Sequence, residues 1–130
     1  MPGVGYLSTD EPITVRLEEP LPGTALLRVA GEVDMLSSPT LRDHIAAALG
    51  EARQRLIIDL EGVEFLGTSG LAALVEGRTS AAERNTELWL VCSRRQVLRP
   101  LRIAGLIDLF HLADTLPDAL TSTNRDSETD

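Results

Sequence analysis

Residues 56–75 restrict the fold of this chain more than any other part of its sequence. They open with a near-continuous apolar run over residues 56–60, which is typical of a strand buried on both faces of a parallel sheet. We expect a loop over residues 61–67 and then a helix that starts at the hydroxyl pair Thr68 and Ser69. A strand that leads into a helix is the repeating unit of a helix-covered parallel sheet, so this stretch predicts an α/β fold.

The rest of the sequence continues this alternation of strands and helices. Two apolar segments joined by a turn over residues 18–23 indicate an N-terminal β-hairpin, and residues 31–34 are expected to end its second strand. This order predicts a mostly parallel central β-sheet flanked by helices. The expected strands cover residues 13–17, 25–30, 56–60, 87–91 and 109–112, and the expected helices cover about residues 37–50, 69–84, 94–104 and 116–120.

A few residues mark the ends of the expected helices. Ser37 or Ser38 is expected to cap the first helix, with Pro39 at its first helical position. Gly50 is expected to end that helix. Pro100 lies inside the third long helix, where a proline shortens or kinks the helix because it has no N–H.

Length and composition fit one domain and argue against several classes of partner. The 130 residues, 43% of them hydrophobic, suffice for one core of ordinary size, and we expect a domain over residues 12–118 between a flexible N-terminus (1–11) and an acidic flexible tail (119–130). The net charge of −8 argues against nucleic acid and membrane surfaces as partners. No apolar run approaches the roughly 18 residues of a membrane span, and the first residues do not resemble a signal peptide, so we expect a cytoplasmic protein.

The hydroxyl pair at the start of the second long helix allows two interpretations. Thr68 or Ser69 caps the helix, or the unpaired N–H groups and partial positive charge of the helix start serve an anion such as a phosphate. A phosphate attached to Thr68 would add roughly 1.5 to 2 negative charges. The helix start tolerates this charge, whereas a partner packed over it does not. The expected effect is release of a complex with little change of structure.

The sequence lacks the arrangements that enzymes and metal sites need. Residues 67–70 match neither a P-loop nor a Gly-x-Ser-x-Gly elbow. His44 lies in the first helix and His111 in the last strand, so neither has a reason to act as a base beside Thr68. These two histidines and Cys92 also lack metal-ligand spacing. We therefore predict a protein that is not an enzyme and that holds no metal and no cofactor.

Three further features have ordinary structural explanations. Cys92, the only cysteine, follows an apolar run and is expected to be a buried residue at a strand end. Glu61 and Glu64 are expected to be solvated loop carboxylates. A basic helix face is usually solvated, although it also fits an acidic patch on a partner. The residues of this face are Arg94, Arg95, Arg99 and Arg102.

Three stretches carry a resemblance to a known family. Residues 31–34, Gly-Glu-Val-Asp, match a Gly-Glu-(Leu/Val/Ile)-Asp motif that ends the second strand. Residues 58–71 match a strand, a loop and an Asp-Ser-(Ser/Thr)-Gly-Leu helix start, and residues 91–106 match the later strand and helix. On these motifs, and over about residues 11–118, the chain resembles the STAS domain of bacterial anti-sigma factor antagonists, which implies a single STAS-like α/β domain.

The resemblance also implies a mechanism. Unphosphorylated antagonists bind an anti-sigma factor, usually a kinase with a histidine-kinase-like ATPase fold, and thereby free a sigma factor. The kinase phosphorylates the first hydroxyl residue of the motif, which corresponds to Thr68 with Ser69 as its neighbour, and a PP2C-type phosphatase restores the binding form. The implied partner-binding residues are Glu32, Asp34, Gly67, Thr68, Ser69, Gly70, Leu71, Ala72 and Val75.

Gly67 departs from the family pattern, which has an aspartate before the acceptor. That aspartate helps to position the acceptor or the partner, so the glycine leaves open whether Thr68, Ser69 or neither is phosphorylated. Asp34 is likewise either a turn or capping residue or a partner contact.

Two other roles of the same fold stay open. A STAS subunit that docks on the ATPase of a lipid ABC transport complex also carries a hydroxyl before Gly-Leu, and a neighbouring transporter gene would favour this role. A small-ligand sensor would hold a free anion at the helix start, and a thermal shift with nucleotides would favour that role.

Overall fold

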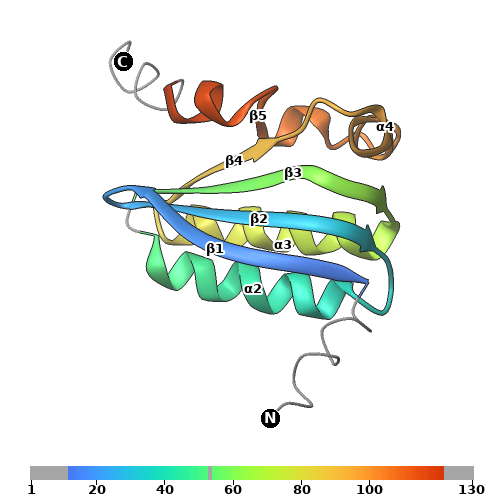
Figure 1. The fold of residues 1–130 in the computed structure, drawn as a ribbon, viewed down its shortest axis with the longest axis horizontal. Coiled ribbons are helices and arrows are strands. Elements are labelled where there is room, and N and C mark those ends of the chain that lie inside the picture. Colours follow the sequence, from blue (N-terminus) through green and yellow to red (C-terminus); the bar gives the residue numbers. More distant parts are fainter. Residues whose placement is uncertain (1–11, 53, 122–130) are drawn as a thin grey trace.

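A single β-sheet with helices on both faces forms the core of the protein (Figure 1). The structure, a computed structural model, describes residues 12–52 and 54–121. Within these residues the five strands lie in the order β1-β2-β3-β4-β5, with β1 antiparallel to β2 and every later pair parallel. The elements are β1 (Ile13–Leu21), β2 (Thr24–Val33), α2 (Ser38–Glu51), β3 (Arg55–Leu66), α3 (Thr68–Glu83), β4 (Glu87–Val91), α4 (Arg95–Ile103), the 3-10 helix η1 (Ile107–Leu109), β5 (His111–Ala113) and a helical turn over residues 116–121.

The core has two parts, one on each face of the sheet. Successive side chains of a strand point to opposite faces, so Leu27 and Ile58 face one side while Leu26 and Ile57 face the other. The first pair packs in the larger cluster, which also contains the buried side chains of α2 and α3. The second pair packs in the smaller cluster, against apolar residues of the turn over 116–121. The prediction of a central strand buried on both faces is therefore confirmed, and so is the α/β fold with its N-terminal hairpin.

Three strands are longer than the sequence predicted. β1 continues through the expected turn to Leu21, β2 continues to Val33, and β3 continues through residues 61–66, where we expected a loop. The extension of β3 depends on pairing with β2 rather than on local sequence, and it includes two register shifts, each with one extra residue in β3. At one of them Gly62 allows close approach, because a Cβ there would lie 2.7 Å from the Ala30 Cβ.

The helix and strand ends also need correction in three places. α2 continues past Gly50 to Glu51, so the glycine does not end it. α4 continues past Pro100 to Ile103, and the proline costs one backbone hydrogen bond without breaking this short helix. Near the C-terminus, residues 107–109 form η1, and β5 covers only residues 111–113 because those residues are the ones that pair with β4.

The described residues extend past the predicted end of the domain. Residues 119–121 belong to the last helical turn, and Ala119 is fully buried, so the prediction of a flexible tail from residue 119 is wrong for these three. The predicted flexible segments 1–11 and 122–130 lie outside the described residues.

Candidate functional site

The candidate site lies where β2 and β3 end and where α2 and α3 begin. Val33 and Leu66 are the last residues of these parallel strands and pair with each other, so both strands end at the same edge of the sheet. The Gly67 N–H donates a 2.8 Å hydrogen bond to the Val33 carbonyl and joins the two strand ends. Because each strand leads into a helix within a few residues, the starts of α2 and α3 lie beside one another.

Asp34 closes the turn between β2 and α2. Its Oδ1 accepts hydrogen bonds from the Leu36 N–H and the Ser37 N–H, both at 3.0 Å. The single proton of the Ser37 hydroxyl lies between this Oδ1, 3.1 Å away, and the Glu32 carbonyl oxygen, 2.8 Å away. The bond from the Ser37 N–H has the largest effect in lowering the pKa of Asp34 below its ordinary value of 3.8, since such bonds stabilise the ionised carboxylate. The structure thus gives Asp34 the role of a turn residue, and its contact with a partner stays a prediction.

A pair of serine hydroxyls joins the two helix starts. Ser38 Oγ lies 2.6 Å from the Asp34 carbonyl oxygen and 2.8 Å from Ser69 Oγ. A carbonyl only accepts and a hydroxyl has one proton, so Ser38 donates to Asp34 and accepts from Ser69. Ser38 is buried, and therefore the Ser69 hydroxyl is committed to a partner inside the protein.

Thr68 differs from Ser69 in both position and contacts. It is the first residue of α3 and it is exposed, whereas Ser69 is half-buried. Neither hydroxyl caps the helix: Gly67 is the N-cap residue, with φ −88° and ψ 178°, and no side chain caps α3. The capping interpretation is therefore wrong, because both hydroxyls lie within the first helical turn rather than before it.

Gly70 fixes the position of this first turn against the sheet. A Cβ at Gly70 would lie 2.6 Å from Val33 Cγ1 and 2.8 Å from Leu66 Cδ1, which is closer than real Cβ contacts. Only a glycine lets α3 pack this closely on the ends of β2 and β3. The Gly-Leu motif thus places the exposed Thr68 in a helical turn that packs directly on the sheet.

The remaining predicted site residues divide between the surface and the core. Glu32 is exposed at the end of β2, where it pairs with Phe65 of β3, and Ala72 is exposed on α3. Leu71 is buried and Val75 is half-buried against the larger core cluster. The structure therefore brings the predicted residues of the β2 and β3 ends and of the first turn of α3 together, whereas Val75 lies two turns further along α3. Gly70 and Leu71 are buried and contribute through packing.

Four exposed apolar side chains near this edge were missed by the sequence analysis. Met35 and Leu36, in the turn before α2, are 79% and 85% exposed, and Phe65 at the end of β3 is 51% exposed. Ile103, at the end of α4, is 75% exposed. The exposure of Met35 and Leu36 could have been predicted from the sequence, because they stand between polar residues and outside the apolar stripe of the helix.

A groove of about 740 Å³ borders the start of α3 on the side of α4. Thr68, Gly67 and Phe65 line one side of it, and Arg95 and Arg99 are among the residues of α4 that line the other. The candidate acceptor and two cations thus face the same open space.

Glu61 holds the beginning of α4 near β3, contrary to the prediction of a solvated loop carboxylate. Its carboxylate accepts hydrogen bonds from the N–H and the hydroxyl of Ser93. The Arg94 guanidinium donates to the Glu61 carbonyl at 2.9 Å. These bonds exist because β3 continues past Glu61, and they position the arginines that follow in α4.

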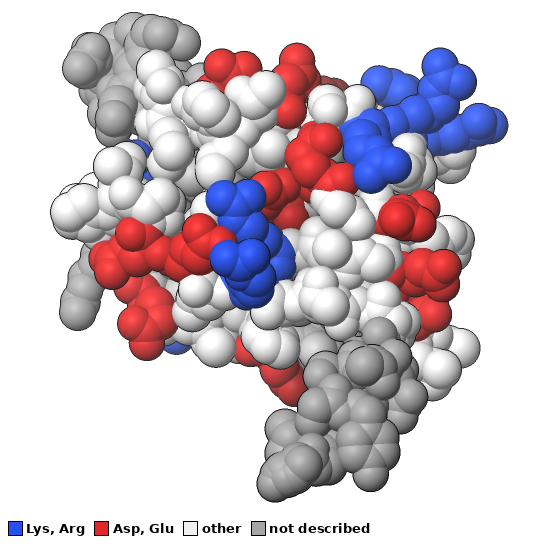
Figure 2. Space-filling model, viewed as in Figure 1, with Lys and Arg blue, Asp and Glu red and all other residues white. Residues whose placement is uncertain are grey.

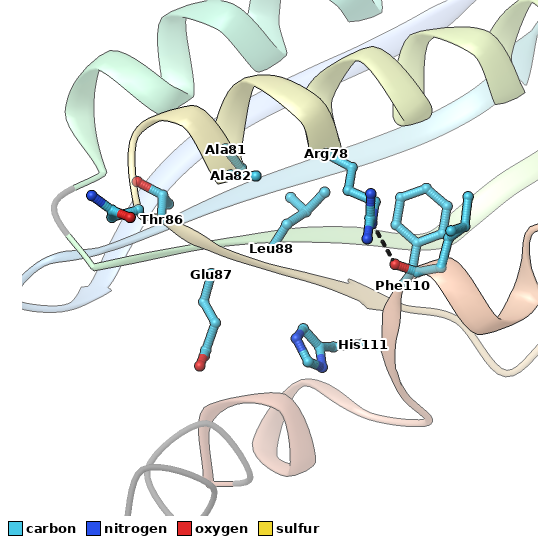
Figure 3. A pocket seen from close by; sticks show the side chains of 10 residues that line it. Arg78, Ala81, Ala82, Thr86, Glu87, Leu88, Phe110 and His111 are labelled. Atoms are coloured by element: carbon cyan, nitrogen blue, oxygen red, sulfur yellow. Dashed lines mark hydrogen bonds between the residues drawn. The ribbon is translucent and has the colours of Figure 1, made fainter.

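A second, smaller cavity lies toward the opposite end of α3 (Figure 3). It measures about 340 Å³, and Arg78 and His111 are among its lining residues. Arg78 Nε donates a 2.6 Å hydrogen bond to the Leu109 carbonyl, and the His111 ring stacks on Trp89 at 4.9 Å. His44 lies elsewhere, on α2, with Nδ1 2.8 Å from the Thr40 carbonyl oxygen. Neither histidine lines the groove beside Thr68.

Cys92 is buried directly after β4, as expected. Burial, together with the nearby charges of Glu61, Asp114 and Asp59, raises the pKa of its thiol to about 12. In the described part of the chain, no group of three or more His, Cys, Asp or Glu side chains is placed to hold a metal ion. The helices of residues 12–52 and 54–121 are too short or too polar to cross a membrane.

Comparison with known proteins shows similarity to anti-sigma factor antagonists of bacteria. The anti-sigma-F factor antagonist RsfB of Mycobacterium tuberculosis is 32% identical over 115 residues, which are 88% of this chain and 93% of that protein. The anti-sigma-F factor antagonist RsfA of the same organism is 28% identical over 75% of this chain and 78% of its own. The crystal structure of an anti-sigma factor antagonist from Mycobacterium paratuberculosis is 34% identical, with a TM-score of 0.77 over 85% of this chain and 92% of that chain.

The family model of the STAS domain matches residues 17–119, which include all the strands from β2 to β5 and the whole candidate site. The chain therefore belongs to the STAS domain family.

Proposed function

We propose that this STAS protein is an anti-sigma factor antagonist controlled by phosphorylation of Thr68. In its unphosphorylated form the edge around Thr68 binds an anti-sigma factor that has a histidine-kinase-like ATPase fold, and a sigma factor is thereby released. The kinase activity of that partner phosphorylates Thr68, and a PP2C-type phosphatase restores the binding form. This exchange takes place in the cytoplasm.

The different environments of the two neighbouring hydroxyls carry the proposal. Thr68 is exposed in the first turn of α3, whereas the Ser69 hydroxyl is bonded to the buried Ser38. A kinase needs a free hydroxyl as the nucleophile, so Thr68 is the acceptor that this geometry favours. The names of the relatives, which are anti-sigma factor antagonists, support the same class of function.

The charge of a phosphate explains how one modification ends binding. The first N–H groups of α3 have no partners within the helix, and the helix dipole favours an anion at this end. The fold therefore accepts the roughly two negative charges of a phosphate without rearrangement. A partner packed over Thr68 would bury these charges away from water, which is costly, so the complex dissociates.

The contact surface that we propose extends the set of residues implied by the family. Glu32, Thr68, Ala72 and Val75 present exposed or half-buried side chains. The exposed apolar residues of the turn before α2 add the contact area that a stable interface needs. Gly67 and Gly70 shape the backbone beneath them.

Binding measurements with purified anti-sigma factors test the proposal. Every histidine-kinase-like anti-sigma factor of the host is purified and titrated calorimetrically with wild type, Thr68→Ala and Thr68→Glu. We expect one of them to bind wild type and Thr68→Ala with similar Kd, to phosphorylate wild type but not Thr68→Ala, and to bind Thr68→Glu at least tenfold more weakly.

Equal melting temperatures of the three proteins would show that the weaker binding of Thr68→Glu does not come from a loss of folding. If no anti-sigma factor binds while the ATPase subunit of a transporter does, the proposal is wrong.

A further inference from the structure

The arginines of α4 stand out on an acidic protein. Figure 2 shows two main groups of Lys and Arg on this face, one at the end of the molecule where α4 lies and one near the middle of the face beside Asp and Glu. All basic residues of the chain are arginines, because the sequence contains no lysine. Arg95 and Arg99 are exposed and line the groove beside Thr68.

These two arginines have no carboxylate partner within the described residues. The ion pairs found there within 4.0 Å involve Arg16, Arg28 and Arg42, and none involves an arginine of α4. Arg95 and Arg99 stand four residues apart, so they are neighbours on the helix surface and repel each other. Arg95 is also the first residue of α4, where the helix dipole disfavours a cation, and no acidic residue lies in that first turn.

The groove therefore combines several sources of positive potential. The start of α3, the start of α4 and the two guanidinium groups border the same space of about 740 Å³. A negatively charged group in the groove would be attracted by all of them. None of the described residues that line the groove is acidic, so the protein itself does not supply this group.

The same groove is also apolar. Leu66, Leu71 and Pro100 line it, together with Phe65 and Ile103, whose side chains are 51% and 75% exposed. The last two extend the apolar surface beyond the groove on both sides. A small anion would leave them exposed, whereas a segment of a protein would cover them.

We infer that this groove binds an amphipathic segment of a partner protein, in which carboxylates pair with Arg95 and Arg99 and apolar side chains cover Phe65 and Ile103. The inference rests on the proposed function in one respect, because we assign this segment to the anti-sigma factor. A phosphate on Thr68 enters the same groove and competes with the carboxylates of the segment for the two arginines. Phosphorylation thus weakens the complex in two ways: it takes the two arginines away from the carboxylates of the partner, and it places a charge that the complex would bury.

Charge reversal tests the inference on the anti-sigma factor that binds wild type in the calorimetric panel. The variant is the double substitution Arg95→Glu with Arg99→Glu. The matched control, Arg16→Glu with Arg84→Glu, changes the net charge equally. Arg16 lies on β1, and Arg84 is the C-cap residue of the 16-residue helix α3, about 24 Å from its start.

We expect the groove variant to bind at least tenfold more weakly, with a slower association rate and a weaker dependence of Kd on salt. The control should stay within twofold of wild type. Both should melt near the wild-type temperature, because all four arginines are exposed and the Arg16–Glu18 ion pair that the control breaks lies on the surface, where such a pair contributes little. If the groove variant and the control weaken binding equally, or if neither does, the inference is wrong.

The outcomes separate this inference from the proposed function. If Thr68→Glu weakens binding and the groove variant does not, the proposed function stands and the inference is overturned. If no anti-sigma factor binds wild type, the proposed function fails, and a synthetic amphipathic peptide of leucine and glutamate then tests the groove, with the leucine–lysine peptide as its control.

The glutamate peptide should shift the NMR amide signals of Gly67 and Ile103 but not that of Asn85, and the lysine peptide should shift none of them. Equal shifts with both peptides would overturn the inference. The inference would also be overturned if the free protein formed a dimer and Ile103→Asp dissociated it. The groove would then bind a second copy of the chain.

Discussion

Ser38 Oγ and Ser69 Oγ lie 2.8 Å apart and join the first turns of α2 and α3. This contact separates the roles of two adjacent hydroxyl residues that the sequence alone leaves equivalent. Ser69 holds the two helix starts together, and Thr68, one residue earlier, faces the solvent.

The first prediction concerns stability. Ser69→Ala removes the hydrogen bond that the buried Ser38 oxygen accepts, while Ser38 still donates to the Asp34 carbonyl, so we expect the free energy of unfolding to fall by about 1 kcal/mol. Thr68→Ala removes an exposed hydroxyl and should change that free energy by less than about 0.5 kcal/mol. Urea denaturation of both variants measures the difference. Equal effects would mean that the Ser38–Ser69 contact contributes nothing.

The second prediction concerns the site of modification. Trypsin cuts after Arg55 and Arg78, so one peptide contains both Thr68 and Ser69. In protein isolated from the host across growth phases, fragmentation of this peptide should place a phosphate on Thr68. A phosphate on Ser69 would contradict the assignment, and its absence in every phase would indicate an unmodified docking protein.

The third prediction uses two glycines within helices. Gly70→Ala forces a methyl group against Val33 and Leu66, and we expect it to destabilise the protein by about 1 to 3 kcal/mol. Gly50→Ala, in the last turn of α2, meets no atom within 4 Å and should instead stabilise the protein by up to about 1 kcal/mol. Thermal denaturation of the pair checks both signs. A neutral Gly70→Ala would show that the first turn of α3 can shift.

The fourth prediction concerns the departure from the family pattern at Gly67. Its φ of −88° suits any residue, and the atoms nearest to a new Cβ belong to the Phe65 ring, 3.1 Å away, whose exposed side chain can move. Gly67→Asp should cap α3 and stabilise the protein by a few tenths of a kcal/mol.

We also expect the cognate kinase to phosphorylate Gly67→Asp faster than wild type. Gly67→Asn caps equally well without the charge, so comparing its rate isolates the effect of the carboxylate. A rate for Gly67→Asp at or below that of wild type would contradict the prediction.

The fifth prediction concerns pH. The pKa of Asp34 is lower in the folded protein than its ordinary value of 3.8, so the unfolded chain takes up the proton first as the pH falls. The stability that the ionised carboxylate contributes is therefore complete above about pH 4 and is lost as the pH falls below 3.8 toward the folded pKa.

Asp34→Asn removes this titration, so its stability should depend less on pH over that window than the stability of wild type does. Asp43→Asn, on an exposed position of α2, is the matched control. Urea denaturation between pH 5 and about pH 2.5 makes the comparison, and parallel curves for wild type and Asp34→Asn would refute the prediction.

Local sequence patterns predicted the order of the elements and the family, because apolar runs and helix-start residues are visible without knowledge of the fold. They failed where a segment depends on its neighbour in space. Residues 61–66 contain a glycine and two glutamates and resemble a loop, yet they form a strand because β2 lies alongside to pair with them.

The candidate site, too, was predicted only where it depends on local sequence. The hydroxyl pair was found from the Thr-Ser-Gly-Leu motif, and the comparison with relatives confirmed the family that the motif indicated. The distinction between Thr68 and Ser69 was out of reach, since it depends on Ser38, which is 31 residues away in the sequence. The groove was equally hidden, because α4 and the end of β3 meet only in the folded protein.

The close packing of Gly70 has a consequence for how a signal would pass through this protein. The first turn of α3 packs directly on Val33 and Leu66, so we expect a phosphate on Thr68 to leave the position of this turn unchanged. Under the proposed function, each phosphorylated molecule no longer binds the anti-sigma factor. The amount of released sigma factor then follows the number of unphosphorylated molecules, and the rates of the kinase and the phosphatase set how fast it changes. The response to phosphorylation ends when the phosphate is removed.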